Sequence, residues 1–196
     1  MRRREVLLGV SMGALGVTWR SGLSRAEEPA PAFGSELSFA LVDSNGQLVR
    51  TEDFRGRWLL VFFGYTYCPD QCPTTLSEIA EALAQLGAVA VQVQPIFISI
   101  DPQRDTPQML REYVKPFDER ILALTGTADQ LERAAKAVGV GFFKVPGSGD
   151  KDYTFAHSAF VTLIGPEGGL VTRFSADEPS TGIASALKAL IDVRRG

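Results

Sequence analysis

The chain has 196 residues, of which 45% are hydrophobic and 22% are charged, and these values predict one globular domain with a substantial core. It contains 20 Lys and Arg and 23 Asp and Glu, and five of the Arg and one of the Glu lie in residues 1–26. Without that segment, 15 basic residues face 22 acidic ones, and the net charge is −7. A domain this acidic is not expected to bind nucleic acid or an anionic membrane surface.

The first 26 residues have the three parts of an export signal. Three arginines at 2–4 form a basic start, residues 6–17 form an apolar stretch, and residues 24–26 place small side chains at a cleavage site. We therefore expect residues 1–26 to be an export signal peptide. The next nine residues, EEPAPAFGS at 27–35, are rich in Pro, Ala and Glu and are predicted to be a flexible linker.

Two features of the export segment stay open. Residues 3–7, RREVL, approximate a twin-arginine motif, so that pathway and general secretion are both candidates. The apolar stretch is shorter than the ~20 residues that span a bilayer, but Trp19 could extend it into an uncleaved anchor. In either case we expect the folded domain, at 36–196, to lie in the periplasm, free or tethered to the inner membrane.

Local sequence patterns predict alternating strands and helices along this domain. Apolar runs between turn residues predict strands at 37–42, 47–50, 58–67, 93–101 and 121–126, and a hairpin at 157–175. Amphipathic runs predict one helical turn at 51–56 and helices at 72–87, 105–117, 127–140 and 181–195. The segment 142–156, FFKVPGSGDKDYTFA, is predicted to be a long loop, which inside a compact domain is usually functional or disordered.

The order of these elements predicts an α/β fold with a mixed sheet. A buried strand that leads through two cysteines into a helix, with a later hairpin and a final helix, is the thioredoxin-like arrangement, here with an added N-terminal β-hairpin. Thr74 or Thr75 is expected to cap the helix after the cysteines, with Pro73 in its first turn. Asp105 or Thr106 is expected to cap the next helix.

Both cysteines of the chain, Cys68 and Cys72, lie in the stretch GYTYCPDQCP at the junction of strand and helix. Four positions in a helix advance about 6 Å along one face, which is within the Cα separation of a disulfide. The same proximity would let two thiolates share one metal ion, and a helix N-terminus lowers a thiol pKa, which favours redox and metal chemistry alike. A static structural disulfide is the third alternative, although so short a loop stabilises little.

His157 is the one histidine of the chain, and a single histidine is more often a structural residue than a ligand. It follows the predicted loop and is expected to begin the apolar strand SAFVTLI, where a flexible segment could bring it to a site. Together with two thiolates it would make a three-ligand set that suits Cu(I), while zinc could use the same set plus water. Spacing alone does not decide between these metals.

Three polar residues of the stretch SIDPQRDTP also follow a strand end, namely Asp101, Arg104 and Asp105. They could form a polar layer over the cysteines. The alternative is an ion pair within the loop plus helix capping, and capping is favoured for Asp105. Met109, the other soft side chain outside the export segment, is expected in the core.

Four stretches in this order resemble the Sco/SenC family of copper-binding proteins: FFGYTYCPDQCPTTL, SIDPQRDTP, LTGT and DYTFAHSAFVTLIGPEGGLV. The resemblance runs from about residue 36 to 192 and implies a thioredoxin-like fold. It also implies that Cys68, Cys72 and His157 bind copper, as Cu(I), Cu(II) or both. One departure is Tyr67, where members often have His, so His157 would be the one imidazole available.

The resemblance further implies a function in delivering copper to the dinuclear copper A site of cytochrome c oxidase. The alternative is a thiol–disulfide oxidoreductase that keeps the cysteines of that site reduced. The expected partners are then the copper A subunit and other periplasmic copper carriers. A peroxiredoxin-like peroxidase is disfavoured because Thr66 stands two residues before Cys68 rather than three. A copper or redox sensor is a further alternative, although the sequence has no output domain.

Overall fold

The computed structural model describes residues 36–147 and 152–195. The predicted export signal and the linker at 27–35 lie outside these residues. The strands are β1 (Ala40–Asp43), β2 (Leu48–Arg50), β3 (Trp58–Gly64), β4 (Val93–Ser99), β5 (Leu122–Thr125), β6 (Phe142–Pro146), β7 (Tyr153–His157), β8 (Phe160–Ile164) and β9 (Leu170–Ser175). The α-helices are α1 (Gln71–Leu86), α2 (Pro107–Val114), α3 (Ala128–Val138) and α4 (Ser180–Arg195), with short 3₁₀ turns η1 (Thr51–Phe54) and η2 (Gly87–Gln92).

Seven strands form one mixed sheet in the order β2-β1-β5-β4-β3-β8-β9. The central strands β3, β4 and β5 run parallel, while β1 and β8 flank them in the antiparallel direction. Residues of β3 and β4 are buried along their whole length, as expected for strands covered on both faces. This arrangement is the predicted thioredoxin-like α/β fold, and β1 pairs with β2 as the predicted N-terminal hairpin.

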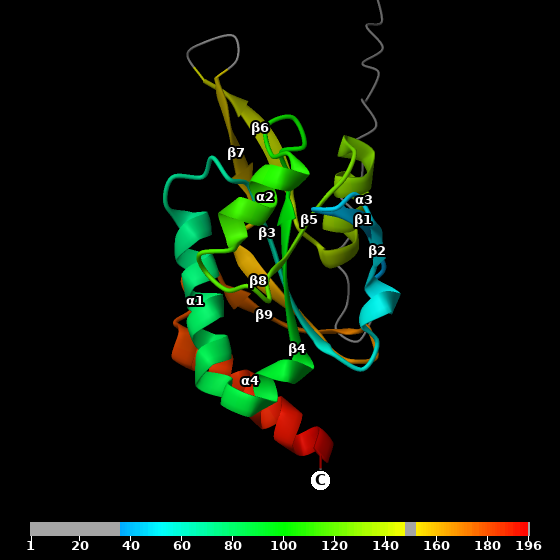
Figure 1. Cartoon of the computed structure of the whole chain (residues 1–196), viewed down its shortest axis with the longest axis vertical. Coiled ribbons are helices and arrows are strands. Elements are labelled where there is room, and N and C mark those ends of the chain that lie inside the picture. The colour runs from blue at the N-terminus through cyan, green and yellow to red at the C-terminus, as the bar shows by residue number, and fades with distance from the viewer. Residues whose placement is uncertain (1–35, 148–151, 196) are drawn as a thin grey trace, which may run out of the picture.

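Helices cover both faces of the sheet (Figure 1). Alternate residues of β3 point to opposite faces, so Phe62 packs with buried side chains of α1, α2 and α4, whereas Phe63 packs with those of α3. The carboxyl ends of β3 and β4 lie toward the β6–β7 hairpin, at the end of the molecule opposite the C-terminus (Figure 1). Across the described residues, no helix combines the length and hydropathy needed to cross a bilayer.

The predicted loop at 142–156 is wrong. Its two ends pair as the antiparallel strands β6 and β7, with Phe142 opposite His157. Aromatic and β-branched residues on both sides of a Gly-containing stretch are a hairpin pattern, and their contacts with the rest of the domain outweigh the loop character of the middle. As a consequence His157 ends β7 instead of beginning the next strand, which starts at Phe160.

The helix caps also differ in part from the prediction. Helix α1 begins at Gln71 after Asp70, so Thr74 and Thr75 lie inside the helix and do not cap it. The Thr75 hydroxyl donates to the carbonyl oxygens of Gln71 and Ala176. For α2 the cap is Thr106, whose hydroxyl accepts a hydrogen bond from the amide of Met109, and the preference for Asp105 is wrong.

Candidate metal centre

The two cysteines lie where β3 gives way to α1, at the carboxyl edge of the parallel strands. Cys72 is fully buried in the core, whereas Cys68 is partly exposed, and both are free thiols. The amide of Cys72 donates a hydrogen bond to the sulfur of Cys68 at 3.4 Å. The structure therefore brings the pair together as predicted, with one thiol open to solvent and one behind it.

Burial shifts the pKa of the Cys72 thiol upward, whereas a position at a helix N-terminus was expected to lower it. The pKa of Cys72 is raised, first by desolvation and further by the neighbouring Cys68, while a backbone hydrogen bond with Tyr65 acts in the opposite direction. The helix N-terminus does not outweigh the loss of water around this sulfur. Cys72 is thus a protonated thiol at neutral pH.

Close packing around Cys72 requires glycine at position 64. A Cβ atom on Gly64 would lie 2.8 Å from the sulfur of Cys72 and 2.9 Å from Cε2 of Phe97. Real Cβ atoms essentially never come this close to a neighbour, so the sulfur or the ring would have to move. Gly64 therefore provides the space that the buried thiol occupies.

Gly64→Ala is expected to lower the free energy of unfolding by about 1–3 kcal/mol, because the added methyl overpacks a filled core. Urea denaturation followed by circular dichroism measures the change. Gly46→Ala is the comparison. A Cβ at Gly46 would have nothing within 4 Å, but the backbone φ of +76° is unfavourable for alanine, so a loss of stability there comes from backbone strain and not from overpacking. If Gly64→Ala were as stable as wild type, the core around Cys72 would not be closely packed, and this explanation of Gly64 would be wrong.

His157 stands at the end of β7 with its imidazole against two aromatic rings. The ring centroids of Phe62 and Tyr65 lie 6.4 and 6.1 Å from that of His157, both in edge-on geometry. Its Nδ1 is 3.1 Å from the carbonyl oxygen of Ser158. A carbonyl only accepts hydrogen bonds, so Nδ1 carries the proton and Nε2 presents a lone pair, which is the arrangement of a histidine ready to bind a metal.

Tyr65 is the residue at which the three predicted ligands converge. Its carbonyl oxygen accepts a hydrogen bond from the amide of Cys68 at 3.2 Å, its backbone contacts the thiol of Cys72, and its ring meets the imidazole of His157. Within residues 36–147 and 152–195, however, no three His, Cys, Asp or Glu side chains are grouped closely enough to hold a metal ion. The two cysteines contact each other, and Tyr65 contacts His157, but the three side chains are not close enough together to bind one metal ion in this conformation.

The pKa of His157 lies below its ordinary value of 6.5 because burial disfavours the charged imidazole, although the Ser158 carbonyl opposes the shift. The unfolded chain then binds this proton at a higher pH than the folded chain does. The contribution of neutral His157 to stability is present above pH 6.5 and is lost as the pH falls through and below 6.5.

We expect wild type to lose more stability than His157→Gln when the pH is lowered from 7.5 to 5.5, a range of about one unit on either side of the ordinary histidine pKa. Urea denaturation of both proteins across that range measures the difference. All other titrating groups are shared, so they cancel in the comparison. A constant difference between the two proteins would mean that folding leaves the His157 pKa unchanged.

Polar residues after β4 anchor the loop that leads to the cysteines. Asp105 is 1% exposed, and its carboxyl group accepts hydrogen bonds from the amide and hydroxyl of Thr66 and from the hydroxyl of Ser99, at 3.0, 2.6 and 2.6 Å. Asp101 forms the predicted ion pair with Arg104. The favoured role of Asp105 as a helix cap is therefore wrong, and its carboxyl group instead binds the loop two residues before Cys68.

Comparison with known proteins identifies the family. The SCO1/SenC sequence profile matches residues 27–192. A relative from Stutzerimonas stutzeri, named for copper binding, is 41% identical over 79% of this chain and 76% of its own length. The chain belongs to the SCO1/SenC family.

Two further SCO1/SenC relatives show that the similarity extends over most of the domain. The human protein SCO1 homolog is 34% identical over 76% of this chain, and the match spans 50% of that longer protein. The solved structure of Bradyrhizobium japonicum ScoI with copper bound is 39% identical, with a TM-score of 0.72 over 81% of this chain and 99% of that one. The fold of the domain is therefore that of a Sco protein.

Tyr153 was not predicted to lie beside the candidate site, and Met109, which lies outside that site, was predicted in the wrong environment. Tyr153 was missed because its segment was taken for a loop, yet Tyr153, Phe155 and His157 follow the period of two that puts side chains on one face of a strand. Met109 was predicted in the core and is 39% exposed, because its face of α2 borders a surface pocket with Thr66 and Tyr113.

Proposed function

We propose that this Sco protein is a copper chaperone that binds one copper ion through Cys68, Cys72 and His157. The observation that carries the proposal is that Tyr65 contacts all three residues: its carbonyl oxygen accepts from the Cys68 amide, its backbone contacts the Cys72 thiol, and its ring meets the His157 imidazole. Thiolate sulfur and imidazole nitrogen form a soft ligand set that suits Cu(I). Relatives with copper in their names or solved with copper bound support the same cargo.

The proposed destination of the copper is the dinuclear copper A site of cytochrome c oxidase, with the copper A subunit as the partner and other periplasmic copper carriers as further ones. The family match supports an action in oxidase assembly, because the Sco family is described as one of cytochrome c oxidase assembly proteins. An exported protein would meet this site on the periplasmic side. The export pattern at residues 1–26 supports that location, whether the segment is cleaved or retained as an anchor.

Oxidation of the cysteines would control copper binding. A disulfide between Cys68 and Cys72 would form as two thiols lose two protons and two electrons to an oxidised partner disulfide, which becomes a dithiol. The sulfurs would then no longer be thiolate ligands. Reduced protein is therefore expected to bind one copper per chain and oxidised protein none.

A second candidate function is thiol–disulfide exchange with the cysteines of the target site. The contact of 3.4 Å between the Cys72 amide and the Cys68 sulfur, together with the partial exposure of Cys68, favours it. In this reaction the thiolate of Cys68 attacks a partner disulfide, and Cys72 then resolves the mixed disulfide. His157 takes no part in either step, so it distinguishes the two functions.

The test is to measure copper per chain and Cu(I) affinity, by competition with a chromogenic chelator, for reduced full-length protein. We expect one copper in wild type, a loss of affinity of at least about 10-fold in His157→Ala, and no tight binding in Cys72→Ser. Met109→Leu is the matched control, because it removes a soft side chain outside the proposed site.

Thiol exchange with a model disulfide is measured on the same proteins. Exchange retained in His157→Ala together with lost copper affinity supports the chaperone. Copper binding that is absent from wild type, or indifferent to His157, would contradict the three-ligand site. Exchange activity alone would then leave the oxidoreductase function.

A further inference from the structure

The hairpin that carries His157 does not belong to the main sheet. Strands β6 and β7 form a two-stranded sheet of their own, and in the part of the chain that the structure describes they pair only with each other. Figure 1 shows this hairpin standing at one end of the molecule. Side-chain contacts to the hairpin must therefore contribute to holding β7, and with it His157, in place.

Tyr65 contacts Thr154, Phe155 and His157 of β7, and Arg104 holds the first residue of the strand, Tyr153. The Nη1 of Arg104 donates a hydrogen bond to the carbonyl oxygen of Tyr153 at 2.9 Å, and its guanidinium carbon lies 3.7 Å from the centre of the Tyr153 ring. The contact thus fixes both the backbone and the side chain of the first residue of β7. His157 lies four residues farther along the same strand, on the same face.

Asp101 holds Arg104 in this position and binds β7 itself. It forms an ion pair with the Nε of Arg104 and accepts a hydrogen bond from the Tyr153 hydroxyl at 2.8 Å. Asp101 is 1% exposed, so little water competes for its carboxyl oxygens. Burial of the Tyr153 hydroxyl, together with its bond to Asp101, raises the pKa of Tyr153 to about 12, so the hydroxyl remains a donor at any physiological pH.

The same loop also contacts the segment that carries the cysteines. The guanidinium of Arg104 lies 4.6 Å from the ring centre of Tyr67, the residue immediately before Cys68. Asp105, the next residue, binds the amide and hydroxyl of Thr66. Arg104 thus stands between Tyr153 of the His157 strand and Tyr67 of the cysteine loop.

We propose that Arg104 is a positioning residue that joins β7 to the cysteine loop and so sets the place of His157 relative to Cys68 and Cys72. The proposal deepens the copper site and, as far as metal is concerned, rests on the proposed function. Arg104 is not proposed to bind the metal. Its effect on copper affinity comes from holding the strand that carries His157. Because Arg presents a planar fork that can bond and stack at once, Lys is not expected to replace it fully.

One readout needs no metal. The chain has a single histidine, so the imidazole carbon–proton resonances in an NMR spectrum belong to His157 alone. In wild type the rings of Phe62 and Tyr65 shift these resonances from their random-coil positions. We expect Arg104→Ala to move them toward random coil and Arg104→Lys to give an intermediate position.

The second readout is copper affinity in a double-mutant cycle. Arg104→Ala is expected to weaken Cu(I) binding about 10-fold in the full chain, as loss of a group that orients a histidine ligand does elsewhere. The same substitution in a His157→Ala background is expected to have no further effect. Equal weakening in both backgrounds would show that Arg104 does not act through His157, and it would overturn the proposal.

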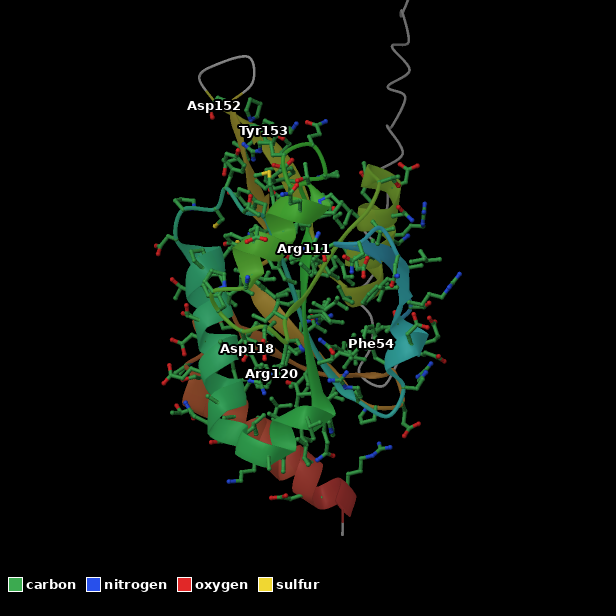
Figure 2. All side chains as sticks on the ribbon, viewed as in Figure 1. Phe54, Arg111, Asp118, Arg120, Asp152 and Tyr153 are labelled. Atoms are coloured by element: carbon green, nitrogen blue, oxygen red, sulfur yellow. The ribbon has the colours of Figure 1, made fainter. Side chains whose placement is uncertain are left out.

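Arg120→Ala is the matched control, because Arg120 also pairs with an aspartate, Asp118, but far from the hairpin tip marked by Tyr153 (Figure 2). It should leave both readouts at wild-type values. Tyr153→Phe, which loses the hydroxyl bond to Asp101 but keeps the ring under Arg104, should retain more than half of the resonance shift. Wild-type imidazole resonances in folded Arg104→Ala or Arg104→Lys would overturn the proposal, and wild type that binds no copper would contradict only the proposed function.

Discussion

Asp105→Ala is expected to lower the free energy of unfolding by about 3 kcal/mol or more, because it removes the acceptor of three buried hydrogen bonds. The Thr66 amide and hydroxyl and the Ser99 hydroxyl all donate to this carboxyl group. An amide that loses its acceptor inside the protein cannot regain water without opening the loop. The measurement is urea denaturation of the reduced full-length protein.

The effect of Asp105→Ala should reach the cysteines as well, because Thr66 stands two residues before Cys68. We expect faster alkylation of the buried Cys72 thiol in the folded variant than in wild type. Thr66→Val, which removes only the hydroxyl, should destabilise by about 1 kcal/mol, and Asp129→Ala, at an exposed position, by about 0.5 kcal/mol or less. A loss at Asp105 no larger than that at Asp129 would contradict a role in anchoring the loop.

Phe62→Ala is expected to lower the free energy of unfolding by about 3–5 kcal/mol. Phe62 is fully buried in the centre of β3, and its ring centroid lies 6.1 Å from that of Phe97 on the neighbouring strand. Removal of the ring leaves a cavity between the sheet and its covering helices, which the packed neighbours can fill only in part. Denaturant midpoints at constant m-value measure the change.

Phe62 is also one of the two rings against His157, so the same substitution should shift the imidazole resonances of this single histidine. Phe143→Ala is the control, because this phenylalanine of β6 is 66% exposed and its removal should change stability by about 0.5 kcal/mol or less. If Phe62→Ala and Phe143→Ala destabilised equally, the assignment of Phe62 to the core would be wrong.

The central part of the fold could be predicted because its pattern is local. The apolar run that becomes β3 is continuous, the turn residues after β1 are adjacent, and the amphipathic spacing of α3 and α4 lies within each segment. For the same reason the two cysteines could be placed at the junction of β3 and α1. The hairpin β6–β7 was missed, because Gly, Pro and Asp in the middle of its sequence have loop character and outweighed the strand pattern of the residues that flank them.

The residues that organise the candidate site became visible only in three dimensions. Asp105 looked like a helix cap, yet its partner Thr66 is 39 residues away in the sequence. Asp101 looked like one half of a loop ion pair, and it also binds Tyr153, 52 residues away. A short polar side chain bonds whatever donor the fold brings near, so its sequence neighbours do not reveal its role.

The sequence by itself determined the α/β class, the cysteine pair at the end of a buried strand and the small inventory of soft side chains, since periodicity and residue chemistry are properties of short segments. The tertiary structure decided that Cys72 is the buried thiol, that the imidazole of His157 lies against Phe62 and Tyr65, and that the loop with Arg104 contacts both β7 and the segment before the cysteines. Burial and partner choice depend on segments that meet only when the sheet, the helices and the β6–β7 hairpin pack together, and this packing places Arg104 between Tyr67 and Tyr153.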